Sequence, residues 1–351
     1  MGFFLGCFGP TTKRERGSRA KNEDRVCQDV VPVDGEESSP NMVKRYKWEE
    51  IERYTQNFKE VIGIGGYSTV YLAKFPNSTL GAVKVYNNSE RLNQIFKSEL
   101  EISQKLHHAN IVKLLGYCDD KDEGVLIFEY IPKGNLQEKL HNDESKLKNQ
   151  LTWKQRMKIA YQLAKALEYL HESCDLQIVH GDIKASNILL DENHNSLLCD
   201  FGFAKMGFSS MIKPPSSSRI KMMGSPGYID PHFLMTGIAS KKSDVYSFGV
   251  ILLELITGLE AFICSGERQV LLTSLVRNKE NFDVEKVVKM IDPRISRDEC
   301  VNKEEVKVMS NIAARCLHHL PSLRLSSSEI CKIMQEKLCS LPEMLVTSDK
   351  P

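Results

Sequence analysis

The cysteines of this 351-residue chain lack any pairing pattern. All 10 stand singly between Cys7 and Cys339, and no two form a C-x-x-C motif. Structural zinc sites and disulfide frameworks depend on cysteines at regular, close spacing, so neither is expected here. Because no secretory signal peptide is recognisable either, we expect reduced thiols in an intracellular protein.

Long apolar runs and an excess of one charge are also absent. Apolar runs such as residues 250–253 are far shorter than the roughly 20 residues of a membrane-spanning helix. With 47 Lys and Arg against 46 Asp and Glu, the net charge is +1, and this balance predicts neither DNA nor RNA binding. The 41% apolar content is sufficient for two hydrophobic cores or one large one.

Residues 178–191 place an acid, a cation and an amide at fixed offsets between two apolar runs. Asp182 can accept the proton of an attacking hydroxyl, and Lys184 can neutralise a transferring phosphate. Asn187 can hold a divalent metal through its amide oxygen, and Asp200, which opens an Asp-Phe-Gly triplet, supplies a second metal ligand. This spacing predicts a phosphoryl-transfer site, although the first motif alone is also typical of a polar turn after a helix.

Together these motifs resemble the catalytic loop and the D-F-G triplet of eukaryotic protein kinases, and Lys184 at this offset is the serine/threonine form. The usual H-R-D reads His180-Gly181-Asp182, as in "non-RD" kinases. The resemblance implies an α+β, bilobal protein kinase fold: a small antiparallel-sheet N-lobe with one helix and a larger, mainly helical C-lobe. It also implies ATP with Mg²⁺ or Mn²⁺ in the cleft.

A glycine-rich turn at residues 62–70 lies between two strand-like runs. Its glycines let backbone N–H groups approach phosphates without an intervening Cβ, although an ordinary hairpin has the same appearance. In the following run, residues 81–86, the period of two puts Ala82 and Lys84 on one face. The resemblance then implies that the ATP-binding residues here are Ile62, Gly63, Ile64, Gly65, Gly66, Tyr67, Ser68, Thr69, Val70, Ala82 and Lys84.

A helix is predicted over residues 91–107. Leu92, Phe96 and Glu99 recur at helical spacing, so Glu99 shares the inward face and needs a partner there. Lys84 is the expected partner, and an exposed salt bridge is the alternative. Ser103 stands where the family carries an aliphatic residue, so we expect less tight packing of this helix.

Residues 125–136 form an apolar run that stops at proline and glycine, and they resemble the hinge between kinase lobes. The resemblance makes Phe128 the gatekeeper, assigns the adenine edge to the backbone of Glu129 and Ile131, and adds Leu189 to the ATP site. The N-lobe then extends to about residue 130 and the C-lobe begins at about 132. The helical spacing of apolar residues over 152–170 predicts a helix that starts with a capping box and supports the catalytic loop.

The serine-rich residues 203–230 resemble an activation segment. His232 stands where the family carries a glutamate, so the usual arginine partner, by position Arg324, is expected to lose a charge-assisted bond. Asp244 opens an almost wholly apolar helix, and the resemblance implies that it braces the catalytic loop. Cys199, beside Asp200, is either a pocket thiol activated by nearby positive charge or a buried, inert residue.

The first residues resemble a lipidation signal, with Gly2 as a myristoyl acceptor, Cys7 as a palmitoyl acceptor and basic residues at 13–21. Gly6 departs from the motif, and a disordered tail is the alternative. The predicted organisation is a disordered segment over 1–45 with this anchor, a kinase domain over 46–341 and a short tail over 342–351. Residues 46–58 resemble the helix that leads into the kinase domain of plant receptor-like kinases.

The sequence is thus identified as a plant receptor-like cytoplasmic kinase of the Pelle type, transferring the γ-phosphate of ATP to protein serine or threonine in receptor-linked signalling. The expected partners are protein substrates, a membrane receptor kinase and, through the N-terminus, the plasma membrane; the expected location is the cytoplasm. A pseudokinase scaffold is the first alternative, favoured by Gly181, Ser68, Ser103 and His232. A small-molecule kinase fits less well, because the segment up to residue 230 suits a peptide substrate.

Overall fold

The structure, a computed structural model, describes residues 43–87, 89–121, 123–141, 150–207, 211–212, 224–265, 268–278, 281–295 and 301–338. All of them lie within the compact unit Val43–Pro351. The predicted lipid anchor, the tail over 342–351 and most of the segment serines (209, 210 and 216–218) lie outside them. Among the described residues, no helix combines the length and apolar character needed to span a bilayer.

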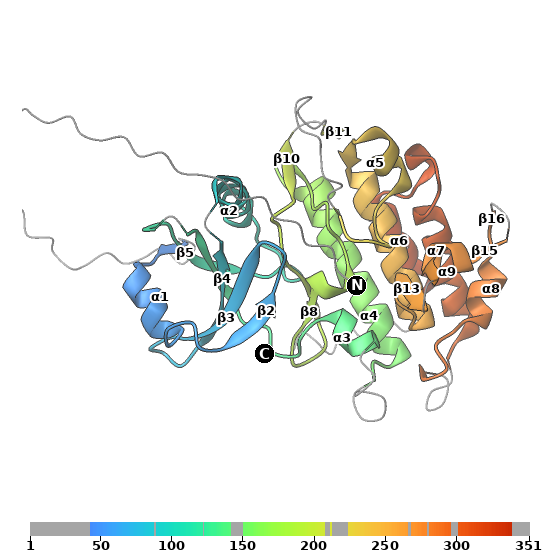
Figure 1. Ribbon diagram of the computed structural model, residues 1–351. Coiled ribbons are helices and arrows are strands. Elements are labelled where there is room, and N and C mark those ends of the chain that lie inside the picture. Colours follow the sequence, from blue (N-terminus) through green and yellow to red (C-terminus); the bar gives the residue numbers. More distant parts are fainter. Residues whose placement is uncertain are drawn as a thin grey trace, which may run out of the picture. The chain divides into compact units, whose positions relative to one another are not determined.

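The N-terminal lobe is built on one sheet with the strand order β1-β5-β6-β4-β3-β2. Figure 1 labels β2, β3, β4 and β5 of this sheet. Its strands are β1 (Lys44–Arg45), β2 (Val61–Ile64), β3 (Ser68–Lys74), β4 (Leu80–Tyr86), β5 (Leu114–Cys118) and β6 (Val125–Glu129). Every pair is antiparallel except β1 with β5, which is parallel. The antiparallel prediction therefore fails only for the two-residue β1, which enters the sheet edge ahead of the first helix.

Two helices accompany this sheet, α1 (Trp48–Tyr54) and α2 (Glu90–Ser103). α1 is the predicted lead-in helix, and its buried residues pack on the strands of the sheet. On α2, Leu92, Phe96 and Glu99 are 8%, 4% and 0% exposed, which confirms the predicted inward face. Ser103 is buried, and its hydroxyl has no hydrogen-bond partner among the described residues, as expected of a polar group in an aliphatic position.

The second lobe is mainly helical, which confirms the predicted α+β kinase-type architecture (Figure 1). Its helices are α3 (Leu136–His141), α4 (Trp153–Glu168) with a π-helical continuation Tyr169–Ser173, α5 (Pro231–Thr236), α6 (Lys241–Thr257), α7 (Leu272–Leu275), α8 (Val284–Lys289), α9 (Lys303–Cys316) and α10 (Ser327–Lys337), with 3₁₀ turns at Ala185–Asn187 and Pro321–Leu323. Thr152 and Gln155 form the predicted capping box of α4. α6 is buried along most of its length, packs on α4 and α9, and ends at Gly258 in the left-handed conformation.

Short two-stranded ribbons connect these helices and place the catalytic segments. The pairs are β7 (Gln177–Val179) with β10 (Lys205–Gly207), β8 (Ile188–Leu190) with β9 (Ser196–Leu198), β11 (Met211–Ile212) with β12 (Ala239–Ser240), β13 (Phe262–Ser265) with β14 (Arg268–Leu271), and β15 (Arg277–Asn278) with β16 (Asn281–Phe282). The loop between β7 and β8 contains Asp182, and β9 leads directly to Asp200. The two predicted motifs therefore lie on adjacent ribbons.

The prediction that Arg324 loses its acidic partner is wrong. Its Nη1 and Nη2 atoms lie 2.6 and 2.7 Å from the two carboxylate oxygens of Asp230, and both residues are almost fully buried. Asp230 also caps α5 by accepting a hydrogen bond from the His232 N–H at 2.9 Å. An acid two residues before His232 thus supplies the charge, in a bidentate geometry that suits a guanidinium.

Candidate active site

A cavity of about 980 Å³ lies between the sheet and the helical lobe. This is at the upper end of the range typical of ligand and cofactor sites, roughly 300–1,000 Å³. Of the residues predicted to bind ATP or metal or to act in catalysis, those that line it are Ile62, Gly63, Ile64, Gly65, Gly66, Tyr67, Ser68, Val70, Ala82, Lys84, Glu99, Phe128, Glu129, Ile131, Asp182, Lys184, Asn187, Leu189 and Asp200.

Thr69 is the exception, because it does not line the cavity. It lies on β3 between Ser68 and Val70, which both do. Successive side chains of a strand point to opposite faces of the sheet, so the Thr69 side chain faces away from this cavity, and its part in ATP binding stays a prediction.

Lys84, on β4, connects the sheet to α2 and to the Asp-Phe-Gly triplet. Its Nζ lies 2.8 Å from each carboxylate oxygen of Glu99 and 2.8 Å from Asp200 Oδ1, which confirms the predicted pairing with Glu99. Burial alone would lower the pKa of Lys84, but the charges of Asp200 and Glu99 outweigh burial and raise that pKa well above its ordinary value. The ammonium is therefore charged and held at the cavity wall.

Tyr86 is a cavity residue that sequence reasoning missed. Its hydroxyl donates a hydrogen bond to Glu99 Oε2, and its ring centroid lies 5.2 Å from Lys84 Nζ. The available signal was the period of two along β4, which puts Lys84 and Tyr86 on the same face.

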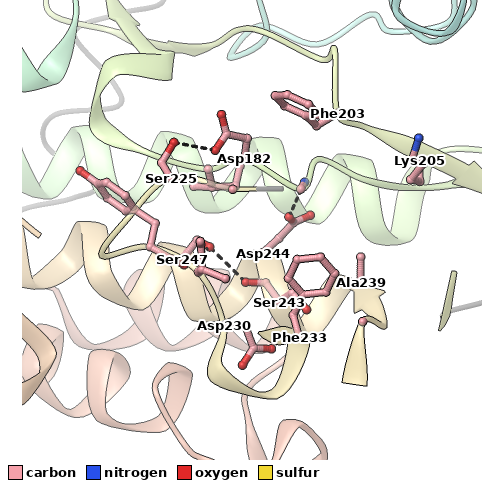
Figure 2. A pocket seen from close by; sticks show the side chains of 16 residues that line it. Asp182, Phe203, Lys205, Ser225, Asp230, Phe233, Ala239, Ser243, Asp244 and Ser247 are labelled. Atoms are coloured by element: carbon pink, nitrogen blue, oxygen red, sulfur yellow. Dashed lines mark hydrogen bonds between the residues drawn. The ribbon is translucent and has the colours of Figure 1, made fainter. Parts of the chain in front are cut away.

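Asp182 and Lys184 converge on one hydroxyl group. Ser225 Oγ donates to Asp182 Oδ1 at 2.9 Å and accepts from Lys184 Nζ at 3.0 Å, while Lys184 Nζ also lies 2.7 Å from Asp182 Oδ2. Figure 2 shows Ser225 directed at Asp182. A serine hydroxyl thus fits between the proton acceptor and the cation, which is the arrangement that phosphorylation of a hydroxyl requires.

The backbone of the catalytic loop is held from α6. Asp244 accepts hydrogen bonds from the N–H groups of His180 at 2.8 Å and Gly181 at 2.9 Å, which confirms the expected bracing role. His171 Nε2, 3.0 Å from Asp244 Oδ2, adds a buried partner that the sequence did not reveal. The contacts of Asp244 with His180 and His171 are buried and that with Gly181 is partly buried, and together they hold the loop in one conformation.

Tyr228 also holds the catalytic loop in place, a role that the sequence did not reveal. Its hydroxyl accepts from the Ala185 N–H at 3.4 Å and donates to Glu254 Oε2 at 2.8 Å. Burial and the charge of Glu254 raise the pKa of Tyr228 far above its ordinary value, so the phenol stays a neutral donor. Tyr228 thereby links the end of the activation segment to the catalytic loop.

Gly181 lines a smaller cavity of about 100 Å³ beside Asp182 (Figure 2). Its φ of +80° favours glycine, and a Cβ there would lie 3.2 Å from the carbonyl oxygen of Phe203. Among the described residues, Lys205 is the one cationic side chain in the lining, against Asp182 and two further acids. This balance of charge does not favour an anion such as a phosphate.

Asn187 and Asp200 are suitable ligands for a divalent metal. The Asn187 amide nitrogen donates to the Asp182 carbonyl at 2.9 Å, so the amide oxygen remains as the metal donor. Burial would raise the pKa of Asp200, but Lys84 brings that pKa to about 2, so the carboxylate is ionised. Within the described residues no cluster of three His, Cys, Asp or Glu exists, and a metal here would complete its coordination with substrate phosphates and water.

Cys199 lines the cavity, but its thiol is not activated. Burial, followed by the charge of Asp200, raises the pKa of Cys199 to about 12 despite the nearby Lys84. This environment therefore favours the inert alternative over the activated-thiolate hypothesis.

Comparison with known proteins agrees with this geometry. The protein kinase domain family matches residues 56–336. A probable receptor-like protein kinase of Arabidopsis thaliana is 48% identical over 84% of this chain and 88% of its own length. The salt tolerance receptor-like cytoplasmic kinase 1 of rice is 47% identical over 93% of this chain and 91% of its own length. The chain therefore belongs to the protein kinase family, among the receptor-like cytoplasmic kinases of plants.

Proposed function

We propose that this serine/threonine kinase transfers the γ-phosphate of ATP to protein hydroxyls with Asp182 as the proton acceptor. The observation that carries the proposal is the hydroxyl of Ser225, which Asp182 and Lys184 contact together at 2.9 and 3.0 Å. A substrate hydroxyl that replaced Ser225 Oγ would have its proton directed at Asp182, with Lys184 beside the developing charge.

The large cavity supplies the nucleotide site in this proposal. Lys84 would hold the phosphates, Ala82 and Leu189 would enclose the adenine, and the backbone of Glu129 and Ile131 would bind the adenine edge. Asn187 and Asp200 would hold Mg²⁺, or Mn²⁺ in its place, and the bound metal neutralises charge on the transferring phosphate. Because these groups are positioned in advance, catalysis rests on orientation and electrostatics.

A pseudokinase scaffold is the alternative, and the geometry disfavours it. The ion pair of Lys84 with Glu99 is formed, and Asp182, Asn187 and Asp200 all line the cavity. Transfer of label from radiolabelled ATP to a generic protein substrate tests the choice, with the Asp182→Asn variant as the inactive reference. ATP binding without transfer would establish the scaffold.

Receptor-linked signalling follows from the relatives' names, which include receptor-like kinases and a calcium/calmodulin-regulated receptor-like kinase of Arabidopsis thaliana, 35% identical over 84% of this chain. A membrane receptor kinase is the partner, and the substrates are proteins. A membrane location through the N-terminus would bring the enzyme to such a receptor.

Membrane attachment is expected to need Gly2 and Cys7 together. One acyl chain gives only marginal, reversible binding, so each of Gly2→Ala and Cys7→Ser should shift the full-length chain from the membrane to the soluble fraction. Fractionation of plant cells that express each variant measures this, with Gly6→Ala as the matched control. Variants that partition like the wild type would contradict the anchor.

Phosphorylation of the activation segment is not expected to be the main switch. With Gly181 in place of an arginine, and with acids around the small cavity, a phosphate on Ser216, Ser217 or Ser218 meets no guanidinium beside Asp182 in the part of the chain that the structure describes. The triple alanine variant should retain most of the wild-type kcat in peptide assays. A fall of about a hundredfold, equivalent to about 2.7 kcal/mol, would contradict this.

A further inference from the structure

Tyr86 is a second anchor for Glu99 that comes from the same strand as Lys84. The tyrosine is 1% exposed and Glu99 is fully buried, so no water competes for the bond between them. The ring also packs against Phe96 of α2, with the ring centroids 5.9 Å apart. The hydroxyl is thus held against α2 at the position of the buried Glu99.

Gly202 of the Asp-Phe-Gly triplet lies near Glu99 Oε2. A Cβ added at Gly202 would lie 3.0 Å from this oxygen, so a side chain at Gly202 would push against the carboxylate. Tyr86 and Lys84 approach the carboxylate from β4, and Gly202 approaches it from the Asp-Phe-Gly triplet. Two donors of β4 therefore hold the carboxylate, and the glycine at 202 leaves it room.

Negative charges outnumber positive charges in the group formed by Lys84, Glu99 and Asp200. Lys84 is one cation that serves two carboxylates, Glu99 and Asp200, each 2.8 Å from its Nζ. Burial raises the pKa of Glu99, and the charge of Asp200 raises it further. The charge of Lys84 and the hydrogen bonds from Lys84 and Tyr86 lower this pKa, because they favour the ionised form. When Lys84 also binds the phosphates of ATP, its hydrogen bonds to Glu99 weaken. The Tyr86 hydroxyl then remains as a donor to Glu99.

We propose, on the basis of the function proposed above, that Tyr86 is a positioning residue for phosphoryl transfer. Its hydroxyl keeps Glu99 ionised and aligned while Lys84 engages the nucleotide. Tyr86 acts through Glu99 and touches no reacting atom.

The test compares Tyr86→Phe with the wild type, because phenylalanine keeps the ring and its packing and removes only the hydroxyl. A lost hydrogen bond to a charged group predicts a fall of about ten- to a hundredfold in kcat/KM for ATP. The acid limb of the pH profile of kcat/KM should move to higher pH. The reason is that Glu99 loses a donor to its charged form, while Lys84, Asp200 and Cys199 keep their places around it.

Two controls separate positioning from simple stability. Tyr71→Phe removes a hydroxyl from β3 of the same sheet, outside the cavity, and should leave both kcat/KM and the pH profile unchanged. In a Glu99→Ala background, which removes the oxygen that accepts from the Tyr86 hydroxyl, adding Tyr86→Phe should cause little further loss. An equal loss in both backgrounds, or an unshifted pH profile, would overturn the proposal.

ATP affinity, measured by titration calorimetry, distinguishes this proposal from the proposed function. A wild-type protein that binds Mg-ATP but transfers no phosphate would overturn the kinase activity alone. Tyr86→Phe should then still weaken ATP binding by a similar factor, and unchanged binding would overturn the positioning role.

Discussion

Replacing Asp182 by asparagine is expected to lower kcat by about two to four orders of magnitude, or about 2.7–5.4 kcal/mol on the barrier. Asparagine can still accept the hydrogen bond that Ser225 Oγ makes at 2.9 Å, but it cannot take up a proton. The loop should keep its conformation, because Asp244 and Tyr228 hold it through backbone N–H groups. Steady-state assays with a serine peptide measure the loss.

The KM for ATP should change little in this variant, since Lys84 and the sheet, rather than Asp182, hold the phosphates in the proposed site. Asp191→Asn is the matched control, because it makes the same change nine residues further along, outside the cavity. We expect its kcat to stay within about twofold of wild type, which is about 0.4 kcal/mol. An Asp182→Asn enzyme with more than about a tenth of wild-type kcat would remove Asp182 from its role.

Replacing Asp230 by alanine is expected to lower the free energy of unfolding by about 3–5 kcal/mol. The change leaves the Arg324 guanidinium, which is 3% exposed, as a buried charge without its carboxylate partner. For a domain of this size that corresponds to a fall in melting temperature of roughly 6–20 °C. Differential scanning calorimetry measures it.

Two further variants isolate the cause. Asp230→Asn keeps a cap for α5 but removes the charge, so it should recover only the capping contribution of about 1 kcal/mol. His232→Ala, at the position where the sequence suggested a lost partner, should change stability by less than about 0.5 kcal/mol, because His232 contributes its backbone N–H to Asp230. Equal destabilisation by His232→Ala and Asp230→Ala would contradict the role of the ion pair.

The sequence by itself determined the features that depend on short spacing. Asp182, Lys184 and Asn187 share one loop, so their offsets alone bring them together around the cavity. Strand and helix periodicity likewise put Lys84 and Glu99 on facing surfaces, and a buried acid on a helix needs a buried cation. These are local rules that hold wherever the element is placed.

Only the tertiary structure decided contacts between distant segments. Arg324 pairs with an acid 94 residues away, and the sequence offered no means to choose Asp230 over the missing glutamate at 232. Ser225 reaches Asp182 across 43 residues, and the hydroxyl of Tyr86 finds Glu99 because β4 and α2 pack at one distance and angle. The pKa of Cys199 likewise follows from burial beside Asp200, since desolvation there outweighs the charge of Lys84. Long-range pairing and desolvation depend on how whole elements pack, and no local pattern in the chain encodes them.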